Sequence, residues 1–516
     1  MTTPTPSPNA EGVCFPAGGD GRRSTTAAGR AIFADSVRDI DATLADRIEH
    51  TRDWHSGYLG PVRDIVAATV RTPDAAVVIS RAGLASAHRR FRFIRGADEL
   101  PVDEAMVKHA GRGFDSVTIE GRIVPEREFS LPYRGRRLFG DLLRRQVDDW
   151  VDAGIAEPSF GAAIHLVMDN PDWLDLHDVD IAVLGASAEM GPTRSLLRWG
   201  ARVHAVDLPR PTAWRRLIDI TRGTAGSLRI PIALDAQGRA PITTGGAVHP
   251  DDDDAVSAVA GADLITHAPE LRIWLDEIPG PFVLGTYVYA DGATHVQLSM
   301  AAEAIAASLC AGRDDITLAF LATPTDAFLV PLDAVLESRR KWDSRGLGGL
   351  LQTPLRLLNQ FEPNYTGTLV TAAGDEVGLN DSLVPQQGPN YALAKRIQRW
   401  RALAARADGT PVSLNLAPAT RTQSVVRNRA LAAAYAGAGR FGVEVFEPAT
   451  STALMAAMLV HDLRNPGSSA NPATPLASPM DLFVEGANHG GLWRAAYSPR
   501  SVLGIAALIG MFDRRH

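Results

Sequence analysis

The sequence predicts an α/β protein built on a doubly wound parallel sheet, preceded by a mainly helical part. Three observations support this class. From Val179 onward, short aliphatic and β-branched runs alternate with helical stretches, and strand, helix and strand in succession imply parallel pairing with right-handed crossovers. A glycine-containing turn directly follows the first of these runs. Before residue 176, apolar residues spaced three and four apart dominate, which indicates amphipathic helices.

Length and composition narrow the class of protein. A chain of 516 residues is too long for one ordinary core, and its 45% hydrophobic and 22% charged residues are typical of a globular protein. The net charge of −7 and the lack of a long basic block argue against nucleic acid as a partner. The two cysteines, Cys14 and Cys310, favour a reducing cytoplasm over a disulfide framework, and they offer no zinc site. No metal site is expected.

No membrane-targeting segment is expected either. The polar, proline-rich N-terminus lacks the regions of a signal peptide. The longest apolar run, Val502–Phe512, is about half of the roughly 20 residues that span a bilayer, so we expect no transmembrane segment.

Changes in composition and hydrophobic pattern along the chain suggest its domain organisation. We expect a disordered tail at 1–30, a mainly helical domain at 31–175, a nucleotide-binding domain at 176–495 with an insertion near 334–366, and a C-terminal helix at 496–516. Within the helical part, the alternating segment "FDSVTIEGRIVPEREFSLPY" predicts a hairpin. The strand candidates of the later part are "DIAVLGAS", "ARVHAVDLP", "RIPIALDA", "ADLITHAP", "ITLAFLAT", "GTLVTAAG" and "PVSLNLAP".

The turn after the first strand candidate is a predicted phosphate loop of a Rossmann-type fold. It runs from Gly185 to Gly191, where the first strand turns into a helix. A dinucleotide's pyrophosphate approaches bare backbone N–H groups at such a helix start, and glycine permits both the turn and the approach. Asp207 ends the second strand at the spacing typical of the acid that binds the ribose hydroxyls. An acid there favours NAD over NADP, while Arg194 and Arg210 keep NADP as an alternative.

Tyr391 and Lys395 form the predicted catalytic pair. They are four residues apart in the helical run "YALAKRIQRWRALAARA", so they share one helix face. A nearby ammonium favours phenolate and lowers the pKa of a tyrosine, which predicts that Tyr391 acts as a general acid or base.

These motifs occur in an order that resembles the short-chain dehydrogenase/reductase family over residues 178–490. "GASAEMG" looks like the family's glycine motif, "IALDA" like its third strand, "ADLITHAP" like its fourth strand and "GPNYALAK" like its Tyr-x-x-x-Lys helix start. The resemblance implies that Tyr391 exchanges the proton of the substrate hydroxyl and that Lys395 holds the nicotinamide ribose. It implies a cofactor site of NAD, or NADP, formed by Gly185, Ser187, Ala188, Met190, Gly191, Asp207, Asp235, Lys395, Pro418 and Thr420. A small-molecule substrate and a homo-oligomer are implied as partners.

The family's active-site serine has no obvious counterpart. With "GTLVTAAG" as the fifth strand, Ala373 or Gly374 falls at the serine position, and Thr371 becomes the candidate catalytic hydroxyl, with Ser382 as a substitute. The sequence therefore leaves three functions open. The first is an NAD(P)-dependent oxidoreductase that acts on a carbonyl or alcohol. The second is a nucleotide-binding regulatory or scaffold protein that has lost redox activity. The third uses the family chemistry for isomerisation or dehydration with bound NAD.

Other polar groups are interpreted as structural. The acidic run at His249–Asp254 is typical of a solvated helix N-terminus rather than of a metal site. For His267 and His295, a packed histidine is the favoured interpretation, with a site role as the alternative.

Overall fold

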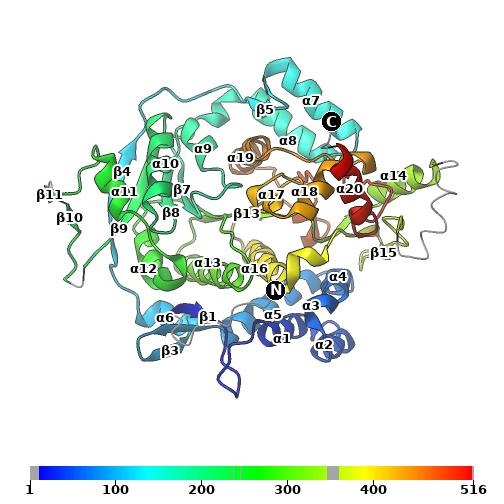
Figure 1. Ribbon diagram of the computed structural model, residues 1–516, viewed down its shortest axis with the longest axis horizontal. Helices are drawn as coiled ribbons and strands as arrows, with labels where there is room; N and C mark the ends of the chain where they lie inside the picture. The colour runs from blue at the N-terminus through cyan, green and yellow to red at the C-terminus, as the bar shows by residue number, and fades with distance from the viewer. Residues whose placement is uncertain (1–10, 236, 244–245, 346–359, 514–516) are drawn as a thin grey trace.

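The computed structural model describes residues 11–235, 237–243, 246–345 and 360–513. Its centre is a seven-stranded sheet with the order β17-β13-β12-β7-β8-β9-β4 (Figure 1). In chain order these strands are β4 (Phe114–Glu120), β7 (Asp180–Leu184), β8 (Arg202–Val206), β9 (Ser227–Ala233), β12 (Phe282–Thr286), β13 (Ile316–Ala322) and β17 (Val412–Leu416). Within this sheet, all strands except β4 are parallel to one another, whereas β4 pairs antiparallel with β9. Numbered along the chain from β7, the parallel strands lie in the order 3-2-1-4-5-6 of a Rossmann-type fold. The prediction of a doubly wound parallel sheet is confirmed.

Helices cover both faces of this sheet (Figure 1). One face carries α12 (Leu264–Asp276), α13 (Ala293–Gly312) and α16 (Gly388–Ala407), and the other carries α9 (Thr193–Arg198), α10 (Pro211–Arg222) and α19 (Pro448–Arg464). Successive strand residues point to opposite faces. Accordingly, Ala182 and Leu184 of β7 belong to one hydrophobic core, while Ile181 and Val183 belong to the other.

The N-terminal segments add further layers outside these helices. Helices α1 (Thr25–Val37) and α5 (Ala75–Arg90) pack on α16, so they lie on the outer side of that face (Figure 1). The remaining elements of this part are β1 (Gly12–Cys14), α2 (Ala42–Glu49), α3 (Trp54–Gly57), α4 (Leu59–Ala68), β2 (Arg92–Arg95), β3 (Asp98–Pro101), α6 (Val102–Lys108), β5 (Leu131–Tyr133), β6 (Arg136–Leu138), α7 (Gly140–Asp152) and α8 (Pro158–Asp169).

Two expectations for the N-terminal part are wrong. Residues 11–30, expected to be disordered, contain β1 and the first turns of α1, whose N-cap Ser24 accepts a hydrogen bond from the Ala27 N–H at 3.1 Å. Residues 1–10 lie outside the described residues. The hairpin expected over 114–133 does not form, because β4 pairs with β9 and β5 pairs with β6. The central sheet thus extends across the boundary expected at residue 175.

The fourth and fifth parallel strands also differ from the expectation. "ADLITHAP" forms the start of α12, where the Asp263 side chain caps the helix by accepting from the Ile265 N–H at 2.9 Å. The fourth strand is β12, and the fifth is β13 rather than "GTLVTAAG". The latter segment supplies β15 (Leu369–Val370) to a separate antiparallel sheet with the order β14-β16-β15. This correction moves the carboxyl end of the fifth strand to Ala322.

The chain between β13 and α16 is longer than a simple crossover needs. It contains β14 (Ala327–Pro331), α14 (Leu332–Asp343), β15 and β16 (Glu376–Asp381). The insertion expected near 334–366 falls within it, although residues 346–359 lie outside the described residues. After β17 follow α17 (Gln423–Arg427), α18 (Arg429–Gly437), α19 and α20 (Pro499–Asp513), and α20 packs on α18. No helix in the described ranges has both the length and the apolar character required to cross a bilayer.

Candidate functional site

The strand register brings the candidate residues to one edge of the sheet. Leu184 and Thr286, the last residues of β7 and β12, lie side by side, and Thr286 pairs with Phe320 near the carboxyl end of β13. The segments that follow these strands therefore leave the sheet at the same edge, which is where doubly wound folds bind their ligands. The strand order reverses between β7 and β12, so the switch point lies beside Gly185.

The loop after β7 has the backbone of a close-approach turn. Gly185 has a φ of +87°, and a Cβ there would lie 3.1 Å from the Val288 nitrogen and 3.2 Å from the Tyr287 carbonyl carbon. Only glycine fits such a position without strain. The loop then reaches α9 at Thr193, whose hydroxyl donates to the Ala186 carbonyl at 2.8 Å. The sequence between Gly185 and Gly191 thus forms the expected strand-to-helix turn.

Asp207 is held against this loop. It follows β8, and its carboxylate accepts from the Ser187 N–H at 2.6 Å and from the Leu208 N–H at 2.8 Å. The N–H groups of Ala188 and Gly191 are used in turns within the loop, to the carbonyls of Gly185 and Ala188. The structure therefore brings the predicted ribose-binding acid and the predicted phosphate loop together.

The loop also contacts the segment after β17. Glu189, next to Met190 in the loop, accepts from the Gln423 N–H at 2.8 Å at the start of α17. Pro418 and Thr420 lie between β17 and α17. The buried Thr420 hydroxyl bonds the Pro418 carbonyl and Ser451 of α19, so this side chain is already engaged inside the protein.

Among the described residues, no hydrogen bond or ion pair joins Asp235 to the loop. It lies beyond β9 in a turn, where its carboxylate accepts from the N–H groups of Gln237 and Arg239 and pairs with the Arg239 guanidinium at 3.0 Å. The backbone and side-chain bonds of this turn hold the pKa of Asp235 below its ordinary value. A role at the adenine stays a prediction.

Tyr391 and Lys395 lie in the first turns of α16. Lys395 Nζ donates to the Leu321 carbonyl of β13 at 3.3 Å and to Gln398 at 3.1 Å. Burial lowers the pKa of Lys395 to about 8, although the charge of Asp326 opposes this shift. For Tyr391, burial raises the pKa above the ordinary value of about 10, and a hydrogen bond with Thr323 acts in the opposite direction. The phenol is therefore protonated at neutral pH.

Thr323, and not the predicted Thr371, supplies a hydroxyl beside Tyr391. It directly follows β13, so it stands at the carboxyl end of the fifth strand, and it bonds Tyr391. Its hydroxyl also lies 3.0 Å from that of Thr325. Thr371, the residue predicted for this role, is instead in the turn between β15 and β16, where its hydroxyl accepts from the Asp375 N–H at 3.1 Å. Ser382 is buried and bonds Asn380. The signal was present in "ITLAFLAT", a strand candidate that ends in threonine.

His295 and Tyr289 complete the cluster around Tyr391. The ring of His295, in α13, has its centroid 5.4 Å from that of Tyr391 and 5.2 Å from that of Tyr289, both edge-on. Tyr289 follows β12 and is 51% exposed, so the cluster reaches the surface on that side. His267, in contrast, is in α12 against Phe114, with Nδ1 2.9 Å from the Thr266 hydroxyl.

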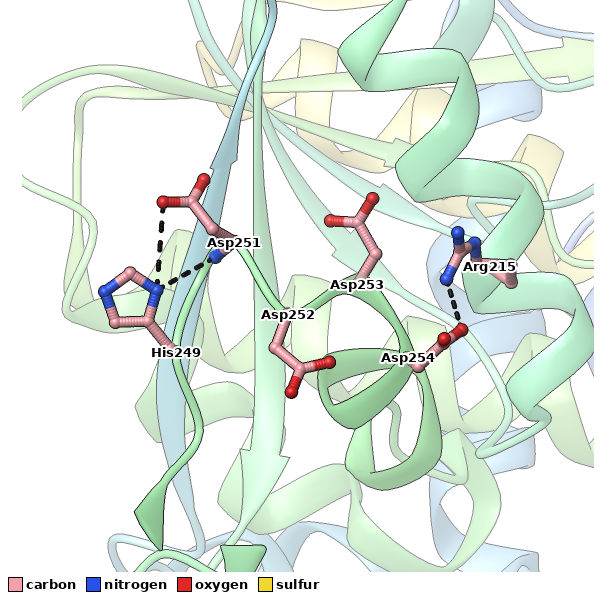
Figure 2. Close-up of a pocket in the computed structure, with 6 residues that line it drawn as sticks. All are labelled: Arg215, His249, Asp251, Asp252, Asp253 and Asp254. Carbon is pink, nitrogen blue, oxygen red and sulfur yellow. Dashed lines mark hydrogen bonds and ion pairs between the residues drawn. The ribbon is translucent and has the colours of Figure 1, made fainter. Parts of the chain in front are cut away.

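The acidic run at His249–Asp254 forms a helix start, as expected (Figure 2). Asp252 caps α11 (Asp253–Val259) by accepting from the Ala255 N–H at 2.9 Å. Asp254 pairs with Arg215 of α10, and Asp251 faces His249. Within the described ranges, no group of three or more histidine, cysteine or acidic side chains is arranged to hold a metal ion.

Comparisons with known proteins give little. No protein-family model matches the chain, and no curated relative was found. Among solved structures, the chain is similar to a thiolation-reductase di-domain from an archaeal non-ribosomal peptide synthetase, with a TM-score of 0.26 and 10% sequence identity over 82% of this chain and 70% of that one. A similarity at this level carries no weight for fold or function.

Proposed function

We propose that the protein is an NAD(P)-dependent oxidoreductase that interconverts a carbonyl compound and its alcohol. The observation that carries this proposal is the Tyr391 hydroxyl, bonded to Thr323 and one helix turn from Lys395, at the carboxyl edge of a Rossmann-type sheet. This edge is also where the Gly185 turn and Asp207 lie, so one nucleotide could reach the loop and the tyrosine.

The residues present fit a dinucleotide. Gly185 has the positive φ that the tight turn of the loop requires, Asp207 offers a carboxylate beside the loop, and Lys395 offers an ammonium one helix turn from Tyr391. When bound, a reduced nicotinamide supplies a hydride to the carbonyl carbon. Tyr391 donates its proton to the carbonyl oxygen, and Thr323 stabilises the resulting phenolate by donating a hydrogen bond. Lys395 favours the same phenolate by its charge.

Asp207 supports NAD as the preferred nucleotide. A carboxylate at this position accepts from ribose hydroxyls and repels a 2′-phosphate. Arg194 and Arg210 lie on either side of it in sequence, in the helix α9 and just before α10. NADP is therefore the alternative, to be decided by measured affinity.

The first test compares nucleotide binding and turnover. We expect NADH to bind more tightly than NADPH in a fluorescence titration and expect the protein to oxidise NADH with a member of a panel of ketones and aldehydes. Tyr391→Phe should retain binding and lower turnover by about 10²-fold or more, because the transferable proton is lost. Tyr133→Phe is the matched control, since the Tyr133 hydroxyl bonds Glu444 outside this cluster.

Three results would contradict the proposal. Failure of either nucleotide to bind at millimolar concentration removes the dinucleotide site. Tight binding without turnover of any carbonyl compound favours the alternative of a nucleotide-binding scaffold. Full activity of Tyr391→Phe on an identified substrate removes Tyr391 as the proton donor.

A further inference from the structure

His295 is a buried polar side chain without a hydrogen-bond partner. It is 1% exposed, and neither of its ring nitrogens has a partner among the described residues. Burying a polar group without a partner is unfavourable, so each such group in a native structure requires an explanation.

The other buried histidines of the described chain show what a structural histidine looks like here. His204 Nε2 lies 2.8 Å from Asp180, His489 Nε2 lies 2.9 Å from Glu157, and His461 Nδ1 lies 3.1 Å from Asp462. Each therefore has a carboxylate partner. His295 differs from all of them, and packing alone does not explain why a polar ring stands at this position.

The surroundings of His295 are those of the proposed active site. Its ring meets the rings of Tyr289 and Tyr391, and the charge of Lys395 acts on it. Burial, together with this ammonium, lowers the pKa of His295 to about 3. The imidazole is therefore neutral at physiological pH, with one N–H donor and one acceptor nitrogen available.

We propose that His295 contacts the substrate and determines specificity for carbonyl compounds that carry a second oxygen on the carbon beside the reacting carbonyl. This inference rests on the proposed function, because it takes Tyr391 as the residue that meets the reacting oxygen. The rings of His295 and Tyr391 lie edge to face with their centroids 5.4 Å apart, and we therefore assign one oxygen of a small molecule to each side chain. The neutral imidazole can donate to a carbonyl or hydroxyl oxygen, or accept from a hydroxyl. An α-hydroxy ketone therefore matches both side chains, whereas a simple ketone leaves His295 without a partner.

The kinetic test uses acetoin and 2-butanone, which differ only in the hydroxyl beside the carbonyl. With NADH or NADPH, whichever binds more tightly, we expect kcat/KM of the wild-type protein to favour acetoin by about tenfold or more, the scale of leaving a buried polar group unpaired. His295→Phe keeps a ring of similar shape and removes both nitrogens. It should bring the ratio close to one without lowering the melting temperature of the free protein. His295→Gln keeps a donor and should retain part of the preference.

His267→Phe is the matched control. His267 has a partner in Thr266, so this substitution should lower the melting temperature and leave the acetoin preference unchanged. A wild-type ratio near one, or an unchanged ratio in His295→Phe, overturns the inference. A loss of melting temperature in His295→Phe that matches the loss in His267→Phe also overturns it, because it assigns His295 a structural role.

A second measurement separates this inference from the proposed function. If the wild-type protein reduces neither ketone, the oxidoreductase proposal fails for these substrates, and binding decides about His295. In ¹⁵N-histidine spectra, with the His295 resonances identified through His295→Gln, acetoin should shift the ring nitrogens and 2-butanone should not. Equal shifts with both compounds, or none with either, overturn the inference.

Discussion

Replacing Thr323 by valine tests the proposed active site. Valine has nearly the shape of threonine but lacks the hydroxyl, so Thr323→Val removes the hydrogen bond to Tyr391 and little else. If Tyr391 gives up its proton during turnover, its oxygen becomes negatively charged in the transition state. The lost bond then matters more in the transition state than in the ground state, so kcat should fall.

The expected magnitude follows from that change of charge. A hydrogen bond to a charged group contributes about 1.5–3 kcal/mol, against about 0.5–1.5 kcal/mol for a neutral pair. The bond therefore contributes about 1–1.5 kcal/mol more in the transition state than in the ground state, and its loss predicts a decrease in kcat of about 5- to 13-fold. The affinity for NADH should remain unchanged, because Thr323 contacts neither the Gly185 loop nor Asp207 through any hydrogen bond in the described chain.

The assay is steady-state NADH oxidation with the best carbonyl substrate of the panel, together with a fluorescence titration of NADH. Thr323→Ser keeps the hydroxyl and should restore most of the activity. Thr325→Val is the matched control, because the Thr325 hydroxyl bonds Thr323 and Gln387 rather than Tyr391. Wild-type turnover by Thr323→Val, in a protein where Tyr391→Phe is inactive, would show that the Thr323 contact has no part in the reaction.

Further predictions follow from the loop, the lysine and the C-terminal helix. Gly185→Ala should cost about 1–3 kcal/mol of unfolding free energy in a denaturant titration, and weaken NADH binding, because φ is +87° and the new Cβ would lie 3.1 Å from backbone. Lys395→Met should abolish turnover yet raise the melting temperature below pH 8. This difference in melting temperature between the variant and the wild-type protein should disappear between about pH 8 and 10.5, because the buried lysine of the wild-type protein loses its charge. A difference that stays constant over this pH range would contradict the prediction. Gly510→Leu should destabilise the protein strongly in thermal unfolding, because a Cβ there would lie 2.0 Å from the Ala433 carbonyl, whereas Gly504→Ala, with no neighbour within 4 Å, should not.

Much of the sheet could be predicted because buried parallel strands are short, nearly continuous apolar runs. Strands β7, β8, β9, β13 and β17 all coincide with strand candidates of the sequence. The phosphate loop and the helix of Tyr391 followed from local rules of glycine turns and helical spacing. Both depend on neighbouring residues only, which explains why one sequence suffices to find them.

The wrong strand predictions arose where the local sequence pattern does not distinguish a strand from a helix. "ADLITHAP" is a short apolar run, and such a run fits a strand or a buried helix segment equally well. The Asp263 cap was the local sign of a helix. Strand β12 is not among the strand candidates of the sequence, so "ADLITHAP" took its place as the fourth strand. "GTLVTAAG" was then placed as the fifth strand, which put the predicted catalytic hydroxyl at Thr371, whereas Thr323 is the residue that follows the fifth strand of the structure.

The pKa of Tyr391 also shifts in the opposite direction from the one that its helical spacing from Lys395 suggests. Helical spacing predicts a lowered pKa for the tyrosine, but burial raises it, and the Lys395 ammonium donates instead to the Leu321 carbonyl and Gln398. Tyr391 therefore holds its proton at neutral pH and is ready to act as an acid. Alcohol oxidation requires phenolate as the base, and that form is scarce until the pH approaches the raised pKa. For the proposed reaction, the protonated phenol is the form that carbonyl reduction uses, so we expect oxidation of the alcohol, and not reduction of the carbonyl, to become faster as the pH is raised.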